Sequence, residues 1–174
     1  MSIYAIPISV AIAATALLAA CDRESADKEP NVQSATSNEA SRSALVQYEA
    51  VRASLAKDDI GSATTRAKSL ESQARAAAAT ATGTSKQQWT ELAKAAAHLS
   101  TLPQQDADEV RKAFGTVSQS LIALLAADPK LAEGLFVFEC PMAQGYKKWV
   151  QPAPKIENPY MGSKMLECGS KTSL

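Results

Sequence analysis

The sequence predicts an all-α protein: an up-down four-helix bundle with an irregular Cys- and Met-containing C-terminal segment packed against it. Three observations support this fold class. Alanine is abundant while aromatic residues make up only 5% of the chain, which favours closely packed helices over a sheet. Four consecutive stretches repeat apolar residues at the helical period, and each is bounded by helix-breaking or capping residues. After Pro129 this period is lost.

Length and charge limit the organisation and the partners. The 174 residues leave room for one modest domain once a leader is removed. The 18 basic and 18 acidic side chains give a formal net charge of zero, so no nucleic-acid partner is expected from bulk electrostatics.

The N-terminus predicts an envelope protein. Residues 1–20 carry no charged side chain, and the apolar run within them is too short to span a bilayer comfortably. It ends in Leu18-Ala19-Ala20-Cys21, which resembles the lipobox of bacterial lipoproteins. By this resemblance residues 1–20 are a signal peptide, and a lipid on Cys21 anchors the protein to a membrane, facing the periplasm. The inner or outer membrane stays undecided, and an ordinary secretory leader or a short anchor helix is the alternative.

Residues 21–40 are predicted to be a disordered polar linker. They lack periodic apolar residues and contain Pro30 with several Ser, Asn and Gln residues.

Residues 41–128 are predicted to form the four-helix bundle. The first helix ends at Lys57-Asp58, and Asp58 or Asp59 caps the second, which ends at 82–84. The predicted apolar face of the first helix is Ala44, Tyr48, Val51 and Leu55. That of the second is Ile60, Ala63, Ala67, Leu70, Ala74, Ala77 and Ala78.

The third and fourth helices each begin with a capping pattern. Ser85 and Gln88 predict a capping box for the third, which Pro103 ends, and Asp106 with Glu109 begins the fourth. The predicted face of the third helix is Trp89, Leu92, Ala93, Ala96 and Leu99. That of the fourth is Val110, Ala113, Phe114, Val117, Leu121, Leu124 and Leu125.

Residues 129–174 form the C-terminal segment of the same domain and hold most of the sulfur. Two of the three cysteines and three of the four methionines lie between Pro129 and Gly169. Residues 135–138 are apolar and are predicted to be a strand or an extended segment packed on the bundle. A helical turn from Met161 would place Met161, Met165 and Cys168 on one face.

This segment resembles a bacterial family of domains of unknown function. The residues that carry the resemblance are Cys140-Pro141-Met142-Ala143, Trp149, Ile156, Asn158-Pro159-Tyr160, Gly162, Met165-Leu166 and Cys168-Gly169, and more loosely Arg111, Phe114 and Ser118. Members are secreted or lipid-anchored helical domains, alone or joined to periplasmic adaptor (membrane-fusion) proteins of copper/silver-type heavy-metal efflux systems. The sequence departs from the family at Met161, where an aromatic residue is expected, and in a short loop before Trp149.

The resemblance implies association with a heavy metal and with an efflux adaptor protein. Thiolate and thioether ligands suit Cu(I) and Ag(I), and the segment supplies four: Cys140, Met142, Met165 and Cys168. Trp149 and Tyr160 would shape the pocket around the ion.

A second interpretation stays open beside the metal site. In an oxidising compartment Cys140 and Cys168 are also expected as a disulfide, which contributes about 3–4 kcal/mol in the loop-entropy model. The protein would then be a non-enzymatic interaction or structural domain of the envelope without metal. The Sγ–Sγ separation discriminates between a bridge and an open pair.

An enzyme is not expected. The sequence shows no paired-carboxylate or Ser/His/Asp pattern, no phosphate-binding loop and no Cys-x-x-Cys pair. Its single histidine, His98, falls on the polar side of the third predicted helix, where solvent exposure is expected.

Overall fold

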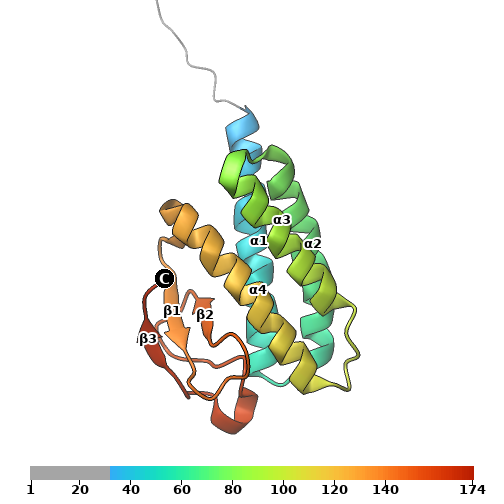
Figure 1. The fold of residues 1–174 in the computed structure, drawn as a ribbon, viewed down its shortest axis with the longest axis vertical. Coiled ribbons are helices and arrows are strands. Elements are labelled where there is room, and N and C mark those ends of the chain that lie inside the picture. Colours follow the sequence, from blue (N-terminus) through green and yellow to red (C-terminus); the bar gives the residue numbers. More distant parts are fainter. Residues whose placement is uncertain (1–31) are drawn as a thin grey trace, which may run out of the picture.

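The computed structural model describes residues 32–174, with side chains from residue 38 onward. Four α-helices come first in the chain: α1 (Val32–Ala56), α2 (Ile60–Thr80), α3 (Gly83–Ser100) and α4 (Ala107–Ala127). A short 3-10 helix η1 (Pro129–Ala132) follows, and then strand β1 (Phe136–Glu139), strand β2 (Lys148–Gln151), 3-10 helix η2 (Gly162–Met165) and strand β3 (Ser170–Thr172). Figure 1 shows α1, α2 and α3 side by side, with α4 crossing them obliquely.

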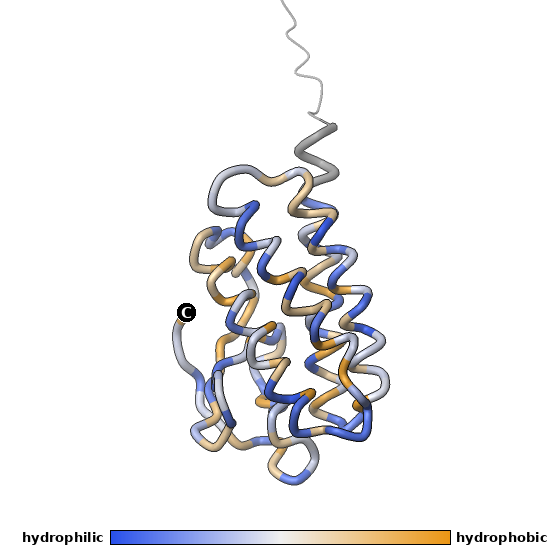
Figure 2. The backbone as a smooth tube through the Cα atoms, turned by 45° about the vertical axis from the view of Figure 1, so that its right-hand side comes forward, coloured by the Kyte–Doolittle hydropathy of each residue, from blue (hydrophilic) through white to orange (hydrophobic). Residues whose placement is uncertain are grey.

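The helical core matches the faces predicted from the sequence. Every residue predicted to be in these four faces is buried except Ile60, which is half-buried. Figure 2 shows hydrophobic and hydrophilic stretches alternating along the helices, as the 3.6-residue period requires. The four-helix prediction and its core are therefore confirmed.

Two of the predicted helix starts are confirmed and one is wrong. Asp59 accepts a hydrogen bond from the Ser62 amide, and Asp106 accepts one from the Glu109 amide, so both cap their helices. In contrast, α3 begins at Gly83, and the predicted cap Ser85 lies within its first turn. The physical reason is Gly83 itself: its φ of 55° lets the chain turn directly into the helix.

The fold is not purely α-helical, which corrects the predicted class. The C-terminal segment, expected to be irregular, contains a three-stranded antiparallel sheet in the order β2-β1-β3. Only β1 coincides with the predicted extended run. The strands β2 and β3 have four and three residues, too few for an alternating pattern to emerge, and their pairing with β1 is non-local.

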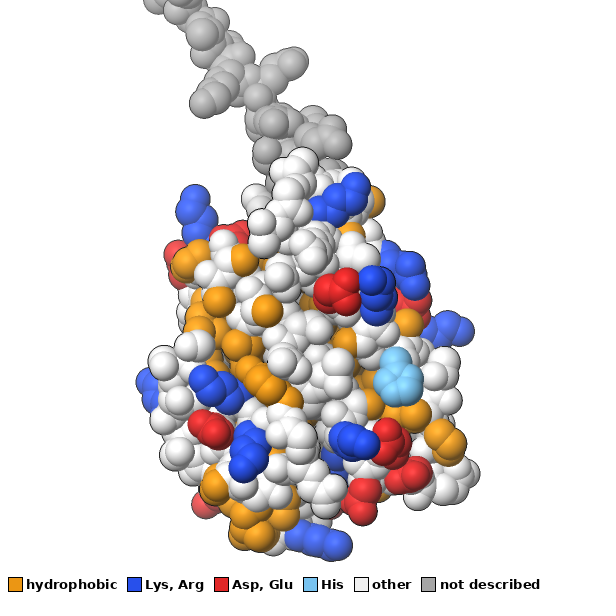
Figure 3. All heavy atoms as spheres, viewed as in Figure 1, with side chains coloured by type: hydrophobic (Ala, Val, Ile, Leu, Met, Phe, Trp, Pro, Cys, Tyr) orange, Lys and Arg blue, Asp and Glu red, His pale blue; other side chains and the backbone are white. Residues whose placement is uncertain are grey.

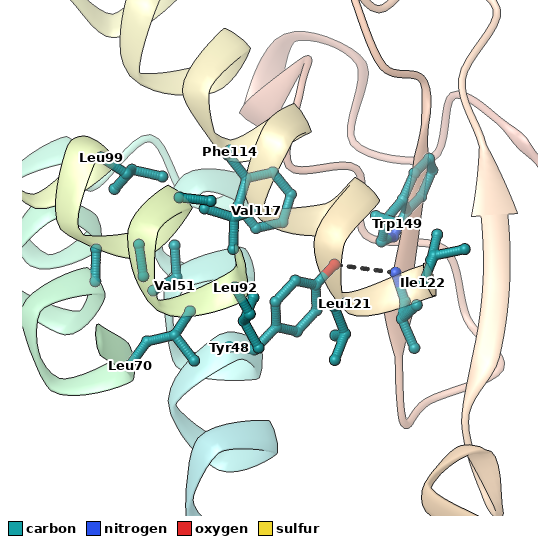
Figure 4. Close-up of a cluster of buried hydrophobic side chains, with 14 of the residues drawn as sticks. Tyr48, Val51, Leu70, Leu92, Leu99, Phe114, Val117, Leu121, Ile122 and Trp149 are labelled. Atoms are coloured by element: carbon teal, nitrogen blue, oxygen red, sulfur yellow. Dashed lines mark hydrogen bonds between the residues drawn. The ribbon is translucent and has the colours of Figure 1, made fainter. Parts of the chain in front are cut away.

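The sheet lies beside α4, on the side away from α2 and α3 (Figure 1). Buried contacts of Tyr48 join it to the helices. Figure 4 shows the Tyr48 ring reaching from α1 past α4, where its hydroxyl accepts a hydrogen bond of 3.2 Å from the Val150 amide of β2. The same hydroxyl lies 2.8 Å from Ser118 Oγ on α4. One tyrosine therefore ties together α1, α4 and β2.

The N-terminal predictions fall mostly outside this description. The signal peptide of residues 1–20, Cys21 and the linker up to residue 31 lie outside the described residues. The rest of the predicted linker differs from the structure, because α1 begins at Val32. Within residues 32–174 no helix combines the length and apolar character needed to cross a membrane.

Candidate functional site

The sheet brings Cys140 and Cys168 together. In the β1–β3 ladder Glu139 pairs with Ser170, so Cys140 directly follows the last paired residue of β1, while Cys168 lies two residues before the start of β3. The two Sγ atoms lie 3.6 Å apart, and both cysteines are free. The pair thus joins two segments 28 residues apart in the chain at one end of the sheet.

The two thiols differ in exposure. Cys140 is fully buried, whereas Cys168 is only partly buried. The pKa of the Cys168 thiol is raised, first by its hydrogen bond with Cys140 and then by burial. The raised pKa favours the protonated thiol of Cys168, so an ion bound through this sulfur must displace its proton.

The three methionines of the segment do not all line the same pocket. Met142 and Met165 are both exposed, at 58% and 41% of their surface. Met142 lines a pocket of about 280 Å³ together with Met161, and Met165 is not among the lining residues. The pocket reaches the turn that carries Cys140, since the buried Ala143 also lines it and donates a backbone hydrogen bond to the Cys140 carbonyl.

Trp149 and Tyr160 pack behind the cysteine pair. Their rings meet edge to face, with centroids 6.0 Å apart and an interplanar angle of 79°. Trp149 also stacks on Phe138 of β1, and a Cβ added at Gly169, next to Cys168, would lie 2.9 Å from the Trp149 ring. The indole therefore fits closely against the backbone that follows Cys168, which only glycine allows.

Asn158 organises the loop between β2 and η2. Its buried side-chain oxygen accepts hydrogen bonds from the Tyr160 and Met161 amides, at 2.8 and 3.1 Å. Its Nδ2 donates to the Cys168 carbonyl at 2.6 Å, and its backbone amide donates to the Leu166 carbonyl at 2.7 Å. The asparagine of the Asn158-Pro159-Tyr160 motif therefore holds the turn and the second cysteine together.

The contacts that hold this loop to the helices have no signature in the local sequence. Arg111 of α4 donates hydrogen bonds to the Pro159 carbonyl and to the Asp58 carboxylate, and Asp58 also accepts from both the amide and the hydroxyl of Ser163. These partners are 48 to 105 residues apart, so no local pattern connects them. The available signal was the looser part of the resemblance, which included Arg111, Phe114 and Ser118.

Those three α4 residues share one role in the structure. Arg111 contacts the loop at Pro159, and Ser118 contacts the Tyr48 hydroxyl that also binds β2. Phe114 lies between the rings of Tyr48 and Tyr160, with centroids at 5.5 and 5.7 Å. They form the face of α4 that receives the C-terminal segment.

Harder metal ligands do not gather near the pair. Within residues 32–174 no group of three or more His, Cys, Asp and Glu side chains is placed to hold an ion. His98 is exposed on α3, as expected, and appears pale blue on the surface in Figure 3. Among the described residues, therefore, no third Cys, His, Asp or Glu side chain joins the cysteine pair in such a group.

Comparison with known proteins gives one match. A family model described as protein of unknown function (DUF3347) matches residues 44–131, which span about half of α1 and all of α2, α3 and α4. The match ends before Cys140, and the family description names no activity or partner. No curated protein and no solved structure matches the chain.

Proposed function

The chain belongs to the family described as protein of unknown function (DUF3347), and from its paired cysteines we propose that it is an envelope lipoprotein that binds a soft metal ion. The ion is Cu(I) or Ag(I), held by Cys140 and Cys168. The role is binding or assistance to efflux, without catalysis. The observation that carries the proposal is the pair of free thiols 3.6 Å apart, presented by two separate segments.

The chemistry of the donors supports a soft monovalent ion. Thiolate and thioether sulfur select Cu(I) over hard cations, whereas structural zinc requires four ligands of the Cys, His or acidic type. Among residues 32–174 such a zinc set is not assembled. Two thiolates, with thioethers close to them in the chain, suit an ion that accepts few soft ligands.

The methionines contribute differently in this proposal than in the ligand set predicted from the sequence. Met142 lies in the pocket beside the Cys140 turn, where it is available to an incoming ion. Met161, which the resemblance gave no reason to include, lines the same pocket. Met165 lies on η2 and is exposed, so we assign it the weakest part in holding the ion.

The efflux part of the proposal rests on resemblance alone. A lipid at Cys21 would hold the domain at a membrane, and the resemblance to domains joined to copper/silver efflux adaptors suggests such an adaptor as the partner. Trp149 and Tyr160 would shape the ion's surroundings from behind, because they pack against the segment that carries both cysteines.

A competition titration tests the proposal. The reduced full chain is titrated with Ag(I) or Cu(I) against a chelator of known affinity, and one ion per chain is expected. The double variant Cys140→Ser, Cys168→Ser should lose this binding, while Cys21→Ser should keep it. Wild-type protein that fails to compete for either ion would disprove the metal site.

A structural disulfide is the second candidate, favoured by the same short separation. The thiols lie at one end of the β1–β3 ladder, where a bridge would tie the edge strand to the centre of the sheet. Thiol counting on protein isolated from cells without reductant discriminates between the two. The absence of any free thiol, together with the absence of metal, supports the disulfide-stapled interaction domain.

A further inference from the structure

We propose that Asp58 and Arg111, in contact with Gly162, form a clamp that positions the Cys168 thiol against Cys140. We call this the Asp58–Arg111 clamp. The inference rests on the proposed function in that the paired thiols are its site, and it assigns positioning residues to that site. Neither clamp residue is adjacent to a cysteine in the sequence or bonded to one in the structure.

The Asp58–Arg111 clamp connects the helices to the loop that contains Gly162. Asp58 lies in the turn between α1 and α2, and Arg111 lies on α4. Their ion pair bridges these elements, and Arg111 uses its second terminal nitrogen to bind the Pro159 carbonyl. Asp58 binds Ser163 at the start of η2 through the other carboxylate oxygen, Oδ2. The clamp therefore grips the loop on both sides of Gly162.

The same loop is connected to Cys168 through Asn158. The gripped residues Pro159 and Ser163 flank the turn whose backbone Asn158 holds, and Asn158 binds the Cys168 carbonyl at 2.6 Å. The Cys168 amide in turn donates to the Met165 carbonyl at 3.0 Å, at the end of η2. Hydrogen bonds, joined by the short backbone stretch from Asn158 to Ser163, thus lead from the clamp to the backbone of Cys168.

Gly162 shows how closely the clamp fits the loop. Its φ of 58° is one that side chains rarely adopt. A Cβ at this position would lie 1.9 Å from Asp58 Oδ1 and 2.6 Å from Arg111 Nη2. Replacing Gly162 by alanine would therefore force the clamp and the loop apart while leaving both charges in the protein.

The clamp also adjoins the pocket beside the site. Asp58 and Arg111 line that pocket together with Met142, which lies in the turn after Cys140. The Arg111 side chain is only 11% exposed, whereas that of Asp58 is 43% exposed, so the clamp lies at the edge of the helical core with its carboxylate at the surface. Asp58 can therefore be changed without removing any of the buried apolar residues that hold the bundle.

The tendency of the two thiols to form a disulfide, expressed as their effective concentration relative to glutathione, tests the inference without any metal. The full chain carrying Cys21→Ser, which leaves only Cys140 and Cys168, is purified in mild detergent and equilibrated in glutathione redox buffers. Asp58→Asn, Arg111→Gln and Gly162→Ala are each expected to lower this effective concentration about tenfold or more, with helical content retained. Arg75→Gln, which breaks the exposed Arg75–Glu71 pair on α2, is the matched control and should change nothing.

The variant Asp58→Asn, the mildest change, distinguishes a loss of folding from a loss of thiol positioning. Should Arg111→Gln unfold the chain, Asp58→Asn decides, because it keeps the side chain's shape and removes only its charge. A folded Asp58→Asn or Gly162→Ala protein with an unchanged effective concentration overturns the clamp. A purely stabilising role would lower the free energy of unfolding and leave the thiol equilibrium of the folded protein unchanged.

Metal binding then separates this inference from the proposed function. In the same variants the affinity for Ag(I) is expected to fall along with the effective concentration of the thiols. If wild-type protein binds neither Ag(I) nor Cu(I), the proposed function fails, yet the glutathione equilibrium still decides the clamp. If the wild type binds Ag(I) and the folded clamp variants bind it equally well, the clamp fails alone.

Discussion

The side-chain amide of Asn158 donates a hydrogen bond of 2.6 Å to the backbone carbonyl of Cys168. This contact connects the turn after β2 to the second cysteine, and Asn158 is fully buried while making it. The same side chain also accepts from two backbone amides, those of Tyr160 and Met161.

Asn158→Ala is expected to lower the free energy of unfolding by about 3 kcal/mol, because it leaves these buried backbone groups without partners. Urea denaturation followed by circular dichroism measures the change. The exposed Asn38 on α1 gives the control, since Asn38→Ala should stay within about 0.5 kcal/mol of wild type. Equal stabilities for the two variants would contradict the central place of Asn158.

Tyr48→Phe tests how the sheet is joined to the helices. The change removes the hydroxyl that contacts Ser118 Oγ at 2.8 Å and accepts from the Val150 amide at 3.2 Å. A loss of about 1–3 kcal/mol in the free energy of unfolding is expected, because both partners are buried. Tyr146→Phe is the control, as the Tyr146 ring is only half-buried. A Tyr48→Phe protein as stable as the wild type would show that the hydroxyl contributes nothing to this junction.

Acid should weaken the Asp58–Arg111 clamp. The pKa of Asp58 is lowered, first by the hydrogen bond from the Ser163 hydroxyl, with Arg111 and Lys164 as the facing positive charges. Because its folded pKa lies below its unfolded pKa, its contribution to stability is present above the unfolded value, about 4, and is lost as the pH falls through the folded value. The difference in stability between wild type and Asp58→Asn should therefore shrink in acid. A constant difference from neutral pH down into the acid range would argue against this ionisation.

Soft-metal binding should strengthen with rising pH. The Cys168 pKa is raised by its hydrogen bond with Cys140, so the thiol keeps its proton through neutral pH and must release it to bind an ion. Apparent affinity for Ag(I) is expected to rise up to about tenfold per pH unit for each proton released, until the raised pKa is passed. Competition titrations at several pH values measure the slope. An affinity independent of pH would mean that thiolates are not the ligands.

The helical half of the fold was predictable because its information is local. The face of α4, from Val110 to Leu125, repeats at 3.6 residues, and Asp106 marks its start three residues before its hydrogen-bond partner Glu109. The residues that form each of these patterns are only a few positions apart in the sequence. Helix positions and core residues could therefore be predicted from the sequence alone.

The sheet and the loop contacts were not predictable in the same way. β3 is Ser170-Lys171-Thr172, three polar residues that become a strand only because β1 offers them an unpaired edge. Arg111 and Pro159, or Asp58 and Ser163, meet only after the helices have packed. Cys140 and Cys168 were predicted to be partners because they are the two cysteines of the C-terminal segment. Their Sγ–Sγ distance of 3.6 Å could be obtained only from the structure.

X-ray absorption at the copper edge tests the central proposal most directly. The reduced full chain is loaded with one equivalent of Cu(I), and its first coordination shell is compared with that of the Cys140→Ser, Cys168→Ser variant. A shell of sulfur atoms is expected in the wild type, and the variant should lose its bound copper. A shell of nitrogen and oxygen atoms, or one unchanged by removing both thiols, would contradict it.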